Sequence, residues 1–425
     1  MIKKFIINLF NEIKKQKLLL ENYIYLTVIQ IVNTLFYFLI YPFSIKIFGA
    51  SDYGLFLFST TIISYLTLFI SFGIDLPALK ILSQNINDRK IKSELLSDVV
   101  STKFVLSFIS SVVLIVLMFL NPKLSKLLLV NSLQAFSSIF LINWYFQGLQ
   151  KMKWFVFFQL VIRTFSILLL FTLVKKTEDL ILYSSIVSVS VFLIAILSFC
   201  YLIYKEGLSI RFVKFDRIVK FIHVSYHFFL NSSISVVRAQ STTLFVGSYV
   251  GMNEVSYFDL ASKVILLPQS IVSNINNALF PKILKSKEID IKLVKKIFWY
   301  EFFIGVFFVG LVVLFGRNVI QLFLHENIVM AHNLTIIMSI TIMSWLLVGC
   351  IVNFVFIPIN RYDLISKNQL IAFVSFFIFC FTGLFFFKSV YIVAFGIAFS
   401  ALLEILFCFI MVVKLNFFKR VEHNL

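Results

Sequence analysis

The chain is dominated by apolar runs about 20 residues long, which are separated by short polar segments. A run of this length suits an α-helix that crosses a bilayer. The runs are apolar on nearly all sides, whereas the strands of a membrane β-barrel are shorter and alternate between apolar and polar residues. The pattern therefore predicts an all-α membrane protein with about twelve transmembrane helices. We place them at 22–47, 53–82, 98–120, 127–149, 154–174, 180–204, 224–250, 256–284, 297–316, 331–354, 368–387 and 390–413.

The basic residues are distributed unevenly between the two sides of these predicted helices. Of the 38 Lys and Arg residues, 28 lie in the terminal segments and loops of one side, including the loop 80–103, and seven lie in the opposite loops. Loops rich in Lys and Arg stay on the cytoplasmic side of a membrane, so we expect both termini in the cytoplasm. The expected organisation is a cytoplasmic N-terminal segment (1–21), a six-helix lobe (22–208), a basic cytoplasmic linker (209–220), a second six-helix lobe (221–413) and a cytoplasmic tail (414–425).

The composition supports a membrane protein and argues against several other classes. Hydrophobic residues make up 60% of the chain and charged residues only 14%, whereas about a quarter of the residues in a soluble domain are charged. The net charge of +18 does not indicate nucleic-acid binding, because the basic residues are confined to short loops. The sequence also lacks a G-x-x-x-x-G-K-[ST] phosphate-binding loop, which argues against a nucleotide-driven pump. We expect no cofactor and no metal site.

Two pairs of segments resemble each other at a fixed separation along the chain. GASDYGLF (49–56) and GMNEVSYF (251–258) share the pattern G-x-x-acid-x-small-x-F, and the tripeptide KIL occurs at 80–82 and again at 282–284. Both pairs are offset by 202 residues, which corresponds to six predicted helices. Two halves with the same orientation in the membrane form a known transporter architecture. The alternative is chance similarity between apolar segments.

Three predicted helices carry a stripe of polar residues along one face. The stripes include Gln30 in the first helix, Asn231 and Arg238 in the seventh, and Asp259, Lys263 and Asn274 in the eighth. Lipid cannot satisfy the hydrogen bonds of these groups, so they must face protein or a water-filled cavity. We expect a central polar cavity between the two six-helix lobes. The alternative is that the polar groups hold neighbouring helices together.

The cationic residues within the predicted helices are the candidates for contact with a substrate. Arg238 lies near the middle of its helix, where an uncompensated charge costs several kcal/mol. It has no carboxylate within one turn on its own helix, so it needs water, a distant partner or an anionic ligand. Arg163 is also near the middle of its helix, and its side chain either faces a cavity or pairs with another group of the protein. Lys263 follows Asp259 by four residues, a spacing that allows mutual neutralisation.

Three carboxylates are candidates for a site that couples transport to protons or sodium ions. They are Asp75, Asp259 and Glu301. For Asp75, near the cytoplasmic end of its predicted helix, an interfacial role is the alternative. We interpret Glu301 and Glu404 as lying within a few residues of the ends of their helices, where a solvated carboxylate is the ordinary arrangement.

Three segments of the chain resemble a known family. NWYFQGLQKMKWF (143–155), YPFSIKIFGASDYG (41–54) and NNALFPKI (276–283) are similar to segments of the O-antigen and polysaccharide flippases of the Wzx type. These belong to the multidrug/oligosaccharidyl-lipid/polysaccharide exporter superfamily. The resemblance extends over roughly residues 20–415, and W-x-x-Q-G-L is its most distinctive motif.

The resemblance implies a bacterial inner-membrane protein with two six-helix lobes that rock to give alternating access. It implies that the substrate is an undecaprenyl-diphosphate-linked oligosaccharide, an O-antigen or capsule repeat unit, moved from the cytoplasmic to the periplasmic leaflet. Membrane lipids and other polysaccharide-assembly proteins are the further partners it implies. Family members meet this anion with cationic cavity residues, a property that we assign first to Arg238 and then to Arg163 and Lys263.

Three other functions remain as alternatives. A drug/cation antiporter of the same superfamily is expected to favour acidic and aromatic cavity residues, whereas the deepest charges of this sequence are basic. A membrane polysaccharide polymerase is an enzyme that we expect to have a large outer loop, and no long outer loop is predicted here. A scaffold protein does not require the polar stripes. We therefore expect a transporter rather than an enzyme.

Overall fold

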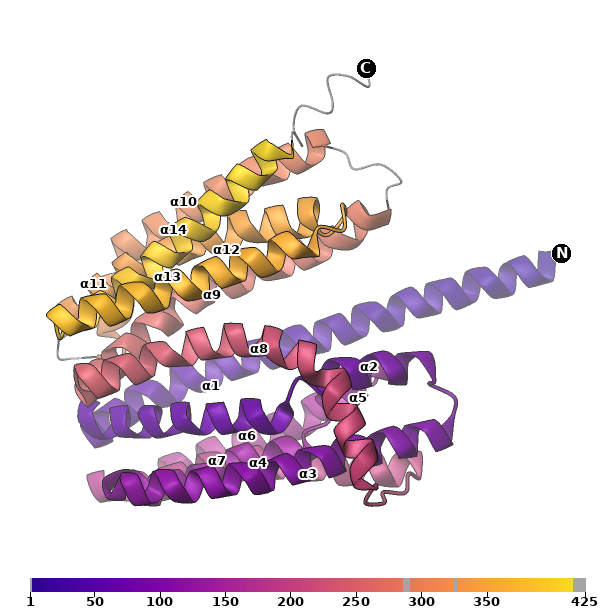
Figure 1. Ribbon diagram of the computed structural model, residues 1–425, viewed down its shortest axis with the longest axis horizontal. Helices are drawn as coiled ribbons and strands as arrows, with labels where there is room; N and C mark the ends of the chain where they lie inside the picture. Colours follow the sequence, from indigo (N-terminus) through magenta and orange to yellow (C-terminus); the bar gives the residue numbers. More distant parts are fainter. Residues whose placement is uncertain (1, 286–290, 325–326, 416–425) are drawn as a thin grey trace. The chain divides into compact units, whose positions relative to one another are not determined.

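The computed structural model describes residues 2–285, 291–324 and 327–415 of the 425-residue chain. Within these residues the regular secondary structure is helical and contains no β-strand (Figure 1). The predicted tail 414–425 lies almost entirely outside the described residues. The helices are α1 (Ile2–Ser71), α2 (Asp75–Gln84), α3 (Arg89–Leu120), α4 (Pro122–Phe140), α5 (Asn143–Gly148), α6 (Met152–Leu173), η1 (Thr177–Asp179), α7 (Leu180–Glu206), α8 (Phe215–Tyr249), α9 (Met252–Lys285), α10 (Ile291–Gln321), α11 (Ile328–Met338), α12 (Ile340–Ile351), η2 (Val352–Phe356), α13 (Tyr362–Phe386) and α14 (Val390–Lys414).

Nine helical segments within the described residues are long and apolar enough to cross a membrane. The chain is therefore a multi-pass membrane protein, as predicted. Helix α1 supplies only one of the nine, over Val32–Ser71, although it covers the first predicted helix and most of the second. Helices α8 and α9, which carry two of the polar stripes, are not among the nine. The number twelve therefore stays a prediction.

Helix α1 consists of two helices that meet at Gly49. The φ angle of Gly49 is 72°, a left-handed conformation that glycine adopts at no steric cost. The second of these helices ends at Ser71 and not at 82, because the next residues leave the helical conformation. Phe72 and Gly73 have φ angles of 42° and 63°, and the chain then restarts as α2. The second predicted helix is therefore wrong in its extent.

The chain forms two compact units. The first contains Met1–Phe48 and Ser59–Ser233, and the second contains Gly49–Phe58 and Ile234–Leu425. The division falls within α8, whereas the sequence analysis places a linker at 209–220. That linker belongs wholly to the first unit, and its last residues form the beginning of α8.

The W-x-x-Q-G-L motif forms a buried connection in the core of the first unit. Trp144, Tyr145 and Phe146 of α5 are all buried in one hydrophobic cluster with residues of α2, α3 and α7. A Cβ atom on Gly148 would lie 2.8 Å from Cδ2 of Leu82 in α2, so the glycine allows α5 and α2 to approach closely. The most distinctive motif of the sequence is therefore a packing element of this core.

A buried polar network joins three helices of the first unit. Asn131 of α4 is fully buried and donates a hydrogen bond of 2.8 Å to the hydroxyl of Ser59 in α1. The Oδ1 atom of Asn131 accepts hydrogen bonds from Ser184 and Ser188 of α7, at 2.8 and 2.9 Å. Gln134 donates to both Asn131 and Ser188. These contacts are interhelical polar packing, which is the alternative to a cavity for isolated Ser and Asn residues.

The double substitution Ser184→Ala/Ser188→Ala is expected to destabilise the first unit by about 1–2 kcal/mol, because interhelical hydrogen bonds in membranes contribute about 0.6 kcal/mol on average and up to about 1.7. The matched control is Ser190→Ala/Ser198→Ala on the same helix. These two hydroxyls are also buried but donate to carbonyl groups of α7 itself. Thermal unfolding in detergent measures both variants, and an equal loss of stability in the control would contradict the role of the network.

The two copies of the repeated motif lie against each other within the second unit. A Cβ atom on Gly54 would collide with the carbonyl group of Met252, and the hydroxyl of Ser256 donates a 2.7 Å hydrogen bond to the carbonyl of Ala50. Adding the offset of 202 to residue 54 gives residue 256, and subtracting it from residue 252 gives residue 50. The contact between residues 54 and 252 is therefore equivalent to the contact between residues 256 and 50. Such an exchange of partners is the signature of a two-fold relation. The repeat is therefore genuine, and its small residue marks a close helix crossing.

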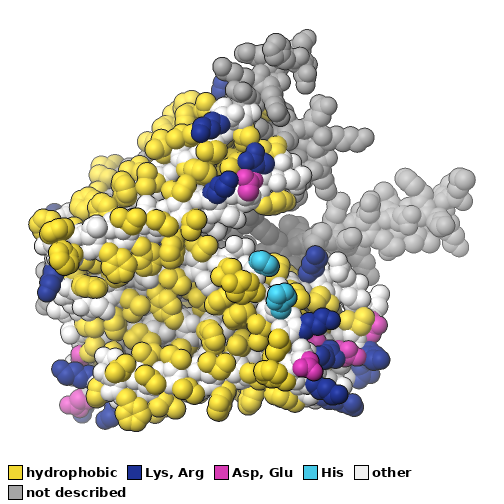
Figure 2. Space-filling model, in the orientation of Figure 1, with side chains coloured by type: hydrophobic (Ala, Val, Ile, Leu, Met, Phe, Trp, Pro, Cys, Tyr) yellow, Lys and Arg dark blue, Asp and Glu magenta, His cyan; other side chains and the backbone are white. Residues whose placement is uncertain are grey.

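The surface agrees with a membrane environment. In the lower part of Figure 2, which shows the first unit, hydrophobic side chains cover the sides of the long helices, and Lys, Arg, Asp and Glu gather near the helix ends. Among the exposed apolar residues, Phe108 and Phe119 of α3 are 72% and 81% exposed. Large apolar side chains this exposed are expected to contact lipid.

Candidate functional site: a polar cavity with an internal ion pair

The second unit contains a cavity of about 620 Å³ whose lining combines apolar and polar side chains. Helices α8, α9, α12, α13 and α14 all contribute to its walls. The polar residues of the lining are Ser235, Arg238, Thr242, Ser262, Gln269, Thr341, Ser344, Asn353, Asn368, Gln369, Ser400 and Glu404. A cavity of this size holds a small ligand or the charged part of a larger one.

Arg238 and Glu404 form an ion pair in the wall of this cavity. The Nη1 atom of Arg238 donates a 2.8 Å hydrogen bond to Oε1 of Glu404. The second carboxylate oxygen, Oε2, accepts a 3.1 Å hydrogen bond from the hydroxyl of Ser344. The side chain of Glu404 is 14% exposed and that of Arg238 is 35% exposed. Thus the carboxylate is held at both oxygens, whereas the guanidinium is reached from the cavity.

The prediction for Glu404 is wrong. Its carboxylate does not lie in solvent near a helix end, because residue 404 is well inside α14 and is bonded to Arg238 and Ser344. The carboxylate of Glu404 is also a distant partner for Arg238, which was one of the three alternatives given for compensating its charge. Pairing reduces the cost of both charges within the membrane.

The ion pair does not saturate Arg238. A guanidinium carries five N–H donors, and within the described residues Arg238 makes a single hydrogen bond, through Nη1. Its remaining donors are available on the cavity side, and they have the fork geometry that binds carboxylate or phosphate oxygens in pairs. The site can therefore hold an anionic group next to an arginine that the protein has already positioned.

The other predicted substrate residues are distributed over the molecule. Arg163 of α6 belongs to the first unit, where its Cζ atom lies 4.2 Å from the ring centroid of Phe36 in α1. Asn231 is an exposed residue of α8. Lys263 and Asp259 are half-buried in α9 and do not line the described cavity. Among the predicted substrate residues whose side chains the structure describes, only Arg238 lines the cavity.

The remaining two predicted residues are Gln30 in α1 and Asn274 in α9. Both lie outside the residues whose side chains the structure describes. Their assignment to a cavity therefore stays a prediction.

The structure also places the other two predicted coupling carboxylates, Glu301 and Asp75. Glu301 of α10 is 4% exposed, so the expectation of a solvated carboxylate is wrong for this residue as well. Asp75 accepts a 2.8 Å hydrogen bond from Nζ of Lys103, which also donates to the carbonyl of Ser138 at 3.2 Å. Lys103 was counted with the cytoplasmic loop 80–103, but its side chain is only 1% exposed. It lies inside α3, where a partner is required.

Asp75→Asn is expected to lower the free energy of unfolding by about 2 kcal/mol, because it leaves the ammonium group of Lys103 buried without its counter-charge. The value is below the usual range for a buried pair since the carboxylate of Asp75 is itself 39% exposed. Asp363→Asn is the control, because Asp363 pairs with Arg361 at the surface. The double variant Asp75→Asn/Lys103→Met should recover most of the loss in thermal unfolding. If Asp75→Asn were as stable as Asp363→Asn, Asp75 would not stabilise Lys103.

Several lining residues were not found by sequence reasoning. Glu404, Ser344, Gln269 and Asn368 were not proposed as cavity residues, yet all four line it. Glu404 carried a usable signal that our interpretation of it as a residue near a helix end missed: it lies nine residues before the end of the helix predicted at 390–413. Opposite charges at mid-span in the same lobe are natural partners. The other three are ordinary polar residues in apolar helices, with no distinguishing pattern.

Comparison with known proteins identifies related sequences. Residues 19–287 match the family described as polysaccharide biosynthesis proteins. The chain is 22% identical over 268 residues to a protein of Escherichia coli (strain K12) described as a candidate O-antigen transporter, a match that covers 62% of this chain and 64% of that protein. A protein of Shigella dysenteriae with the same description is 22% identical over 268 residues, covering 62% and 67%. The match thus spans less than two thirds of the length of the Escherichia coli relative.

Comparison with solved structures identifies the fold. The lipid II flippase MurJ, in an inward closed conformation, superposes with a TM-score of 0.73 at 16% identity, covering 92% of this chain and 87% of that chain. An inward-facing multidrug resistance transporter of the MATE family, from the MOP superfamily, gives a TM-score of 0.66 at 14% identity, covering 92% and 99%. The predicted all-α transporter fold is thereby confirmed.

Proposed function

Because the chain belongs to the polysaccharide biosynthesis protein family, we propose that it is a flippase for a lipid-linked oligosaccharide. In this proposal, the substrate is an O-antigen or capsule repeat unit on undecaprenyl diphosphate, and it moves from the cytoplasmic to the periplasmic leaflet. The fold shared with a lipid II flippase and the matches to candidate O-antigen transporters support the proposal. Its protein partners are other polysaccharide-assembly proteins.

The observation that carries the proposal is the unsaturated guanidinium of Arg238 in a polar cavity. A diphosphate cannot cross hydrocarbon unaided, since an isolated charge in a medium of low dielectric constant is very costly. Arg238 can offer paired N–H donors to its oxygens. The amide and hydroxyl groups of the cavity, such as Gln269 and Asn368, offer hydrogen bonds of the kind that sugar hydroxyls form. Meanwhile the polyprenyl chain remains in the lipid.

The orientation in the membrane is a further part of the proposal. We place the protein in the bacterial inner membrane with both termini in the cytoplasm, on the basis of the Lys and Arg bias between the loops. Transport by alternating access requires a driving force, and we propose a proton or sodium gradient. Asp259 and Glu301 are its candidate carboxylates, and Asp75 is a weaker one because it is already paired with Lys103.

A drug/cation antiporter is the second candidate function, and one observation favours it. Glu404 places a carboxylate in the cavity wall, and a carboxylate there could attract an organic cation. However, both oxygens of Glu404 are engaged by Arg238 and Ser344. The accessible charge of the pair is the cationic one, and this favours an anionic substrate. A polysaccharide polymerase and a scaffold protein are less well supported, since the relatives are described as transporters.

Complementation tests the proposed function. The chain is expressed in a bacterium that lacks its own O-antigen flippase, and surface glycan is measured by gel analysis and by antibody. The proposal predicts that surface glycan returns, and that a deletion of the native gene causes lipid-linked repeat units to accumulate on the cytoplasmic side. Drug sensitivity of the native deletion strain, without any glycan defect, would favour the antiporter instead.

A further inference from the structure

The segment that joins α7 to α8 lies extended along α3 in a regular register. The backbone N–H groups of Ser209, Arg211 and Val213 donate to the hydroxyls of Ser93, Ser97 and Ser101, at 3.3, 3.2 and 3.3 Å. Four residues of an α-helix rise about 6 Å, and two residues of an extended chain rise slightly more. Serines spaced by four therefore meet every second N–H group, and the linker is held along about two turns of α3.

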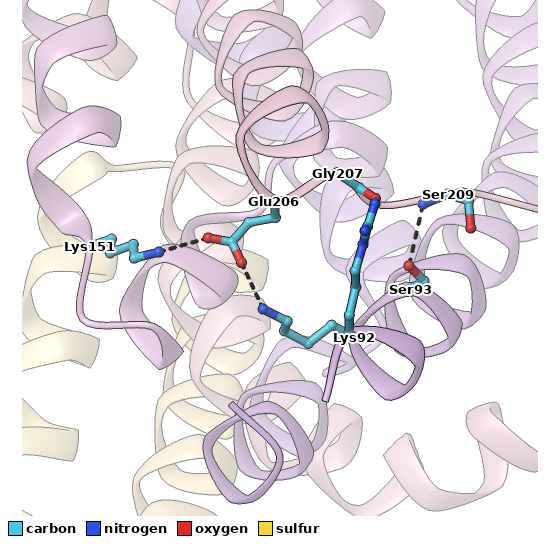
Figure 3. Close-up of polar contacts among 7 residues, drawn as sticks. Lys92, Ser93, Lys151, Glu206, Gly207 and Ser209 are labelled. Carbon is cyan, nitrogen blue, oxygen red and sulfur yellow. Dashed lines mark hydrogen bonds and ion pairs between the residues drawn. The ribbon is translucent and has the colours of Figure 1, made fainter. Parts of the chain in front are cut away.

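Charged contacts fix both ends of this linker. Figure 3 shows the carboxylate of Glu206, the last residue of α7, between Lys92 and Lys151, with N–O distances of 2.7 Å to each. The guanidinium of Arg89 donates to the carbonyl of Gly207 through both Nε and Nη2. At the other end, Arg217 of α8 donates to Asp98 of α3 at 2.7 Å. The linker and the start of α3 thus form one connected surface.

This surface encloses a cleft of about 810 Å³ whose charge is strongly positive. Five cationic side chains and one carboxylate line it: Arg89, Lys90, Arg211, Lys214, Arg217 and Glu94. Arg89 and Arg217 are bonded to the protein as described above. Lys90, Arg211 and Lys214 are exposed and form no ion pair within the described part of the chain. Three cations of one cleft that take part in no ion pair create a positive potential, which attracts an anionic ligand.

The cleft borders the apolar surface of α3. Phe212 lines the cleft, is 69% exposed, and packs edge-on against Phe104 of α3 at a centroid distance of 6.2 Å. Phe104 is itself 54% exposed and precedes the exposed Phe108 by one turn. Phe215, at the start of α8, is 67% exposed. The cations therefore lie at the end of a surface that contacts acyl chains, the position that phosphate head groups occupy.

We propose that this cleft binds an anionic phospholipid, whose phosphate head group contacts Lys90, Arg211 and Lys214 and whose acyl chains lie along Phe104 and Phe212. A soluble phosphate compound would match the cations alone, and a neutral lipid would match the aromatic residues alone. An anionic phospholipid matches both. This site lies in the first unit, has no residue in common with the cavity around Arg238, and goes beyond the proposed function.

Lipid binding to the purified full-length chain tests the proposal. The protein is delipidated in detergent, and native mass spectrometry then measures its affinity for phosphatidylglycerol, which is anionic, and for phosphatidylcholine, which is zwitterionic. Each basic residue near an anionic membrane surface strengthens binding about five-fold. The triple variant Lys90→Gln/Arg211→Gln/Lys214→Gln should therefore bind phosphatidylglycerol on the order of 100-fold more weakly than the parent.

The control variant changes three cations at the opposite end of the same unit. Lys123→Gln/Lys126→Gln/Lys175→Gln alters exposed side chains beyond the far ends of α3 and α6 and should bind phosphatidylglycerol as the parent does. All six positions are exposed, and size-exclusion chromatography checks that both variants stay folded. Equal weakening by the two variants, or equal affinity of the parent for the two lipids, would overturn the proposal. Displacement of phosphatidylglycerol by equimolar undecaprenyl diphosphate would also overturn it, because the cleft would then be a site for a polyprenyl diphosphate.

Discussion

Arg238→Ala is expected to reduce transport by about 10- to 100-fold, because a hydrogen bond to a charged group contributes about 1.5–3 kcal/mol and Arg238 is the cavity residue that can meet a diphosphate. Arg238→Lys should retain part of the activity, since lysine keeps the charge and loses the paired geometry. The measurement is surface glycan in the complemented strain, normalised to the amount of protein by blotting.

Arg361→Ala is the matched control for this prediction. Arg361 is also an arginine that pairs with a carboxylate, through two hydrogen bonds to Asp363, but it lies in an exposed turn before α13. The variant Arg361→Ala should transport at the level of the parent. An Arg238→Ala protein that fails to insert into the membrane would lose transport for a structural reason. The amount of inserted protein is therefore measured in the same cells. Normal transport by Arg238→Ala would contradict the assignment of the substrate site.

Gly54→Leu is expected to destabilise the second unit by about 3 kcal/mol or more. Even a Cβ atom at this position would meet the carbonyl group of Met252, and overpacking ordinarily costs about 1–3 kcal/mol when side chains can give way. Here the obstacle is the backbone at the start of α9, which cannot rotate aside. The helix crossing would have to open, and the 2.7 Å hydrogen bond from Ser256 to Ala50 would be lost with it.

Gly310→Leu provides the control for the crossing. A Cβ atom on Gly310 of α10 would meet nothing within 4 Å, so the same substitution adds a side chain in open space. Thermal unfolding in detergent, followed by size-exclusion chromatography, measures both variants. If Gly54→Leu were as stable as Gly310→Leu, the close contact between the two copies of the repeat would not exist in the protein.

The helices and the repeat were predictable because both depend on local pattern. Apolar runs of bilayer length leave few alternatives to transmembrane helices, and the two copies of the repeat carry a small residue, Gly54 or Ser256, at equivalent places. The end of α1 at Ser71 was not predictable in this way. Phe72 adopts a left-handed conformation that its residue type disfavours. The ring of Phe229 stacks on Phe72 with centroids 4.2 Å apart, a contact across 157 positions of sequence.

The charged sites were only half predictable. Arg238 was recognisable as an intramembrane charge that required compensation, but its partner Glu404 lies 166 residues away, in a different helix. Lys103 was counted with the basic residues of the loop 80–103, although it lies five residues inside the helix predicted at 98–120, and α3 itself begins at Arg89. Pairings of this kind depend on which helix faces pack together, and a single sequence does not contain that information.

Transport by the double variant Arg238→Met/Glu404→Gln, measured beside the two single variants, tests whether Arg238 meets the substrate. Removing both charges leaves no unpaired ion in the cavity wall, so the double variant should be about as stable as the parent. We expect that it nevertheless fails to restore surface glycan, whereas Glu404→Gln alone, which keeps the guanidinium, restores it. Full transport by the double variant would instead show that Arg238 serves only to neutralise Glu404.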